Sequence, residues 1–119
     1  MYNLFIDDER FPANDGKDWK VVRSSQEAID AVKRFGVPDI ISFDHDLGGD
    51  DTSVKFINWL IDAVLDGEVQ MDAPFEYVVH SQNPIGVRNI EGKLQSFFRH
   101  ISPKTESYIF KQYLSETTK

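Results

Sequence analysis

Three short segments of this sequence place carboxylate and imidazole side chains directly after apolar runs. The runs and the segments that follow them are Tyr2–Ile6 with Asp7-Asp8, Ile40–Phe43 with Asp44-His45-Asp46, and Phe75–Val79 with His80-Ser81-Gln82-Asn83. Histidine can give or take a proton near neutral pH. Carboxylates add charge and are ligands for hard divalent cations. If the segments meet in space, these residue types predict an active site.

Each apolar run has the length of a buried β-strand, and a further short strand is expected at 19–23. Helical periodicity separates the strands. One apolar stripe lies between the capping pair Ser24 and Glu27 and the terminating Gly36. A second stripe runs from residue 54 to Gly67, and a third spans 88–101. Residues 9–18 are rich in turn formers and predict a loop, whereas 105–114 fits either a helix or an edge strand.

Alternating strands and helices predict an α/β fold with a mostly parallel sheet. We expect a flavodoxin- or receiver-like three-layer sandwich, with the strand order 2-1-3-4 and the first crossover helix reduced to a loop. Residues 1–119 are expected to form one domain. This order places the three polar segments next to one another at the carboxyl edge of the sheet, where such folds handle ligands.

The composition of the chain limits the kinds of partner that it can be expected to bind. The chain has 119 residues, of which 40% are hydrophobic, and a formal net charge of −7. That charge argues against a broad basic surface for duplex DNA, but a small phosphate-bearing ligand or an RNA terminus remains compatible, because a metal ion offsets charge locally. The sequence has no cysteine, no signal-peptide pattern and no stretch of membrane-spanning length, so a cytoplasmic protein is expected.

The polar segments with their flanks, Leu4–Pro12, Ser42–Gly48 and Val79–Gly86, resemble the cyclic-phosphate-processing receiver-like domain, a family within the response-regulator receiver superfamily. The resemblance implies action on 2′,3′-cyclic phosphates in RNA repair or processing. It also implies catalytic roles for His45 and His80, together with the aspartates around them. The lysine that follows a fifth strand in true receivers has no equivalent here, since Ser102-Pro103-Lys104 follows a predicted helix.

Opening a cyclic phosphate needs an acid, a base and donors for the phosphate oxygens. Neighbouring carboxylates favour the imidazolium form of His45, which we therefore assign as the acid; His80 is then the base, and Asp44 completes the catalytic set. The predicted substrate contacts are Ser81, Asn83, Arg10 or Arg88, and the backbone around Gly48 and Gly49.

A second version of the chemistry uses Mg²⁺ or another divalent metal, held by Asp7, Asp8 and Asp46. The sequence leaves both versions open. Two other functions also remain: a receiver-type signalling module phosphorylated on Asp44, and a non-catalytic protein that binds a cyclic nucleotide. No protein partner is indicated.

Overall fold

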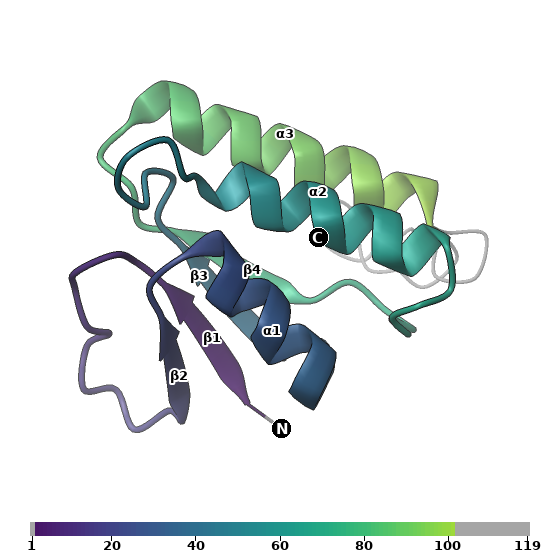
Figure 1. Ribbon diagram of the computed structural model, residues 1–119, viewed down its shortest axis with the longest axis horizontal. Helices are drawn as coiled ribbons and strands as arrows, with labels where there is room; N and C mark the ends of the chain where they lie inside the picture. Colours follow the sequence, from purple (N-terminus) through teal and green to yellow (C-terminus); the bar gives the residue numbers. More distant parts are fainter. Residues whose placement is uncertain (1, 102–119) are drawn as a thin grey trace, which may run out of the picture.

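The computed structural model describes residues 2–101, which contain a four-stranded parallel sheet (Figure 1). The strands are β1 (Asn3–Ile6), β2 (Trp19–Val22), β3 (Ile40–Phe43) and β4 (Glu76–Val79), in the order β2-β1-β3-β4. The receiver-like α/β fold and the strand order expected from the sequence are therefore confirmed. The ambiguous segment 105–114 lies outside the described residues.

Three helices connect and follow the strands: α1 (Ser25–Phe35), α2 (Ser53–Leu65) and α3 (Pro84–His100). The ends of α1 are those predicted, because the Ser24 side chain accepts a hydrogen bond from the amide of Glu27 and Gly36 ends the helix with φ +85°. By contrast, α3 begins four residues earlier than the predicted Arg88. Asn83 caps it by accepting from the amide of Gly86, and a proline fits the first turn, where its missing N–H is not needed.

All three helices lie side by side on one face of the sheet (Figure 1). Right-handed crossovers explain this arrangement, since α1 leads from β2 to β3 and α2 from β3 to β4, in the same direction across the sheet. The chain crosses from β1 to β2 in the opposite direction, and a helix there would cover the other face. That connection is a loop, as predicted. The described part of the chain therefore has two layers, and the expected third layer has no counterpart in residues 2–101.

The core lies between the sheet and the helices. Leu4, Ile6, Ile41 and Phe43 point towards the helices and are fully buried. Alternation sends the intervening strand residues to the helix-free face, where Val78 is 55% exposed. Within the described residues, no helix has the length and apolar character needed to cross a membrane.

Candidate active site

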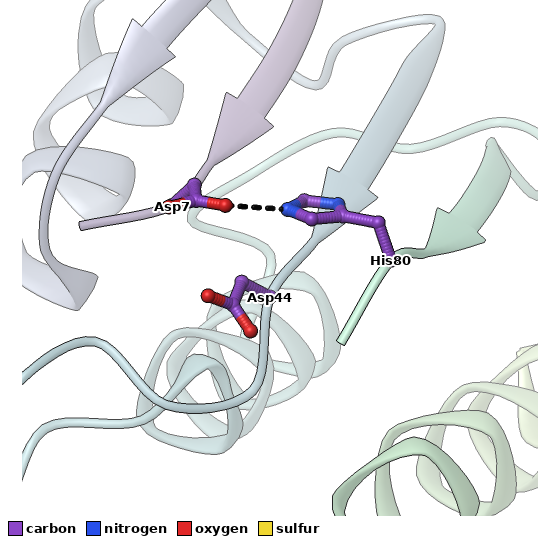
Figure 2. Close-up of side chains that lie close together, drawn as sticks. All are labelled: Asp7, Asp44 and His80. Atoms are coloured by element: carbon purple, nitrogen blue, oxygen red, sulfur yellow. Dashed lines mark hydrogen bonds and ion pairs between the residues drawn. The ribbon is translucent and has the colours of Figure 1, made fainter. Parts of the chain in front are cut away.

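Asp7, Asp44 and His80 stand at the carboxyl ends of the adjacent strands β1, β3 and β4 (Figure 2). One oxygen of each carboxylate and one ring nitrogen of the histidine lie within 4.8 Å of one another. Both aspartates are buried, and His80 is partly exposed. Parallel strands end at a common edge, so residues far apart in the sequence meet there. The structure thus brings together three of the predicted site residues.

Asp7 is the most fully bonded member of this cluster. Its Oδ1 accepts hydrogen bonds from the amides of Glu9, at 3.0 Å, and Arg10, at 2.9 Å. Its Oδ2 accepts from Arg10 Nε and from His80 Nε2, both at 2.9 Å. Burial by itself raises the pKa of Asp7, but the backbone and side-chain hydrogen bonds and the charge of Arg10 outweigh it, so the pKa is lowered. Asp7 is therefore a carboxylate at neutral pH.

Both ring nitrogens of His80 are engaged. Nε2 faces Asp7, and Nδ1 lies 2.8 Å from Ser42 Oγ. The ring also stacks on Phe5, with centroids 4.6 Å apart and planes 9° apart. Because an ionised carboxylate only accepts, Nε2 carries a hydrogen, and in the neutral ring Nδ1 accepts from the hydroxyl of Ser42. A base at His80 would need one of these contacts to break.

Ser42 was not among the residues predicted for the site. It is the polar residue within the otherwise apolar strand β3, and it lies on the helix-free face together with His80. Strand alternation from Asp44 would have found it, since Ser42 and Asp44 are two residues apart.

Arg10 is the cation of the site. Besides its bond to Asp7, its Nη2 lies 3.5 Å from Asp44 Oδ2, and the charge of Asp7 is the main reason that the pKa of Arg10 is raised. Arg23 holds the Arg10 loop in place by donating to the backbone oxygens of Asp7 and Arg10. The side chain predicted to contact phosphate thus bridges two carboxylates.

A cleft of about 750 Å³ opens at this edge of the sheet. Its lining consists of Asp8, Glu9, Arg10, Asp44, Asp46, Gly48, Gly49, Ser81, Gln82 and Asn83. The predicted substrate contacts Ser81, Asn83, Arg10, Gly48 and Gly49 are among them, whereas the alternative Arg88 is not. The predicted metal ligands Asp8 and Asp46 also line the cleft. Four lining side chains are acidic and one is basic. An anionic ligand would therefore need a further positive charge to enter.

His45 makes a separate set of contacts. Its Nδ1 lies 3.0 Å from Asp46 Oδ1, and its ring packs so closely on Gly86 of α3 that a Cβ there would be 2.4 Å from His45 Cγ. The hydrogen bond from His45, followed by one from Asn83, lowers the pKa of Asp46. His45 therefore lies on the helical side of the sheet and outside the Asp7–Asp44–His80 cluster. Among the described contacts, none joins the two imidazole rings.

The side chains of Asn83 and Ser81 also form hydrogen bonds near the start of α3. The side chain of Asn83 caps α3 and donates to Asp46 Oδ2 at 3.4 Å, and the hydroxyl of Ser81 accepts from the amide of Asn83. Glu9 and Gln82 line the cleft without having been assigned a role from the sequence.

The donor set of the Asp7–Asp44–His80 cluster fits a divalent cation. Two carboxylate oxygens and an imidazole nitrogen converge at Asp7, Asp44 and His80, and a guanidinium already lies between the carboxylates. The predicted metal ligands Asp8 and Asp46 line the cleft but are not members of this group.

A family model described as the cyclic-phosphate processing receiver domain matches residues 2–96. The matched range contains every residue of the cluster and of the cleft lining. Neither a curated protein nor a solved structure matches the chain.

Proposed function

The chain belongs to the cyclic-phosphate processing receiver domain family, and from this premise and the site geometry we propose that it is a hydrolase of cyclic phosphodiesters. Its substrates would be RNA termini that end in a 2′,3′-cyclic phosphate, or small cyclic nucleotides. The observation that carries the proposal is the position of Asp44, which belongs both to the Asp7–Asp44–His80 cluster and to the lining of the cleft.

Charge decides how a cyclic phosphate would enter. The acidic lining repels an anion, and Arg10 is already paired with Asp7. Asp7 and Asp44 would hold a divalent cation, which when bound supplies positive charge to the phosphate and polarises it. The start of α3 at the cleft adds the partial positive charge of a helix N-terminus.

The chain's own groups would then orient the substrate. Asp44 has a single long side-chain contact within the described residues, so one of its oxygens is available to orient the attacking water. Arg10 and the backbone at Gly48 are placed at the cleft to contact the phosphate oxygens. His45 would act indirectly, by holding Asp46 and the first turn of α3 in position.

The test is a product assay on 2′,3′-cyclic nucleotides and on RNA with a cyclic end, with and without EDTA. We expect turnover by the wild-type protein, loss with EDTA, and at least about a 100-fold loss in Asp44→Asn. His45→Ala should keep more than about a tenth of the activity, because a group acting through packing contributes less than one at the reacting atoms. His100→Ala, at the far end of α3, is the matched control.

Two outcomes would overturn the proposal. A stable phosphoryl adduct on Asp44 after incubation with a phosphoryl donor, without cyclic-phosphate hydrolysis, would make the protein a signalling receiver. Tight retention of a cyclic nucleotide without product would make it a binding protein.

A further inference from the structure

His80 contributes a nitrogen donor to a cluster whose other donors are carboxylate oxygens. Its ring is held by Phe5 on one face and by hydrogen bonds at both nitrogens. The part of the ring that faces the two carboxylates is Nε2, which lies 2.9 Å from Asp7 Oδ2. An imidazole nitrogen with this orientation has the position of a metal ligand.

Asp44 is the more weakly paired carboxylate of the cluster. The residue is 8% exposed, so its carboxylate has lost most of its contact with water. Within residues 2–101 its one side-chain contact is the 3.5 Å approach of Arg10, at the outer limit of a hydrogen bond. A nearly buried carboxylate with such weak pairing is unfavourable. A divalent ion between Asp7 and Asp44 would supply the missing charge.

Ser42 makes the exchange of proton for metal possible at His80. In the neutral ring described above, Nε2–H donates to Asp7 and Nδ1 accepts from Ser42. For Nε2 to bind a metal, the hydrogen must be on Nδ1 and be donated to Ser42 Oγ, 2.8 Å away. A hydroxyl can play either part because it both donates and accepts. An outer partner of this kind is what orients metal-bound histidines in general.

We propose that Asp7, Asp44 and His80 form a mixed oxygen–nitrogen site for a divalent transition-metal ion of the Zn²⁺ type, with Ser42 as the positioning residue of His80. An imidazole ligand favours such ions, whereas oxygen-only sites suit Mg²⁺. Arg10 is the internal cation that the ion would displace from between the carboxylates. The catalytic role of the ion rests on the proposed function. Metal binding is measured without substrate, so the metal site and the proposed function can fail independently of each other.

The experiment titrates the full chain, stripped with EDTA, with Zn²⁺ and with Mg²⁺ by calorimetry. We expect one Zn²⁺ per chain, bound at least about 100-fold more tightly than Mg²⁺. His80→Gln should lose most of this preference, while His100→Ala, which removes a histidine remote from the cluster, should keep it. Ser42→Ala should weaken Zn²⁺ binding about 10- to 100-fold. Ser42→Thr keeps a hydroxyl at this position and should bind Zn²⁺ with an affinity within about threefold of the wild type.

Pulsed electron paramagnetic resonance with Mn²⁺ as the probe needs no variant. Wild-type protein should show nitrogen coupling from the imidazole of His80. Absence of that coupling, equal affinities for Zn²⁺ and Mg²⁺, or unchanged Zn²⁺ binding in His80→Gln would each overturn the inference. A Ser42→Ala protein with wild-type affinity would remove Ser42 from it.

Discussion

Replacing Gly86 with alanine tests how tightly α3 is docked on the strand end that carries the site. The new Cβ would lie 2.4 Å from His45 Cγ, 2.7 Å from Cδ2 and 2.8 Å from Cβ. Carbon atoms in contact are normally about 3.5–4.0 Å apart, so the His45 ring must move by about 1 Å or the helix must shift. Such overpacking costs about 1–3 kcal/mol.

Two further effects change the expected loss of stability in Gly86→Ala. Alanine gains up to about 1 kcal/mol over glycine as a helix former. A displaced His45 loses its hydrogen bond to Asp46, a loss of about 1 kcal/mol. The two effects roughly cancel, so we expect Gly86→Ala to lower the free energy of unfolding by about 1–3 kcal/mol. Gly92 provides the matched control in the same helix, since a Cβ there meets no atom of residues 2–101 within 4 Å. Gly92→Ala should raise the free energy of unfolding by about 0.5–1 kcal/mol.

The measurement is urea unfolding followed by circular dichroism, with the slope checked for constancy. In a His45→Ala background the clash is absent, so Gly86→Ala should become neutral or stabilising, with a coupling energy of about 2 kcal/mol. If Gly86→Ala and Gly92→Ala move the stability in the same direction by similar amounts, the close packing of His45 on α3 is refuted.

Three further predictions concern charge and pH. Asp7→Asn should destabilise the fold by about 1–3 kcal/mol, because it removes a buried carboxylate that accepts four hydrogen bonds, one of them from the half-exposed side chain of Arg10. Asp46→Asn, at a side chain 65% exposed, should change the free energy of unfolding by less than about 1 kcal/mol. The pKa of Asp7 is lowered by folding, so the stabilisation from its carboxylate is complete above the pKa of aspartate in the unfolded chain and is lost as pH falls through the pKa in the folded state. The difference in free energy of unfolding between wild type and Asp7→Asn, measured by urea unfolding, should therefore narrow from neutral to strongly acidic pH. Burial raises the pKa of Tyr2 from 10.0 to about 12, so its contribution is complete below pH 10.0 and lost as pH rises through about 12. Tyr2→Phe removes the 2.6 Å hydrogen bond to the Gly36 carbonyl and should lower the free energy of unfolding by about 1 kcal/mol at pH 7. In thermal melts, the melting temperature of this variant should fall less steeply with alkaline pH than that of the wild type, and an equally steep fall would contradict the role of this phenol.

The convergence of Asp7, Asp44 and His80 could be predicted because each residue directly follows, or lies at the end of, an apolar run. Parallel strands joined by right-handed crossovers end at one edge, and the order of the strands then decides which ends are neighbours. The helix start at Pro84 was predictable in principle too, since proline is favoured in a first turn and asparagine as the preceding cap. The apolar stripe alone predicts a helix start at Arg88, four residues after the observed start.

Strand alternation predicts that His45 lies on the face of Ile41 and Phe43, opposite Asp44, but the contact of its ring with α3 could not be predicted from residue types. After β3 the chain turns, with Gly48 and Gly49 at φ +90° and +57°, and the amide of Ser53 bonds to the carbonyl of His45. The His45 ring faces away from Asp44, as strand alternation requires, and packs against Gly86 of α3. Two adjacent residues of the sequence thus belong to different environments.

The residue pattern was enough to predict which strands form, in what order they lie, and which ionisable groups stand at their ends, because hydrophobic period and chain connectivity act locally or through simple topological rules. Three contacts became known only from the folded chain: Arg10 bridges Asp7 and Asp44, Ser42 is hydrogen-bonded to His80, and His45 packs against α3. Those pairings depend on contacts of a few ångströms between side chains from different elements, and such distances are fixed by packing rather than by spacing along the chain.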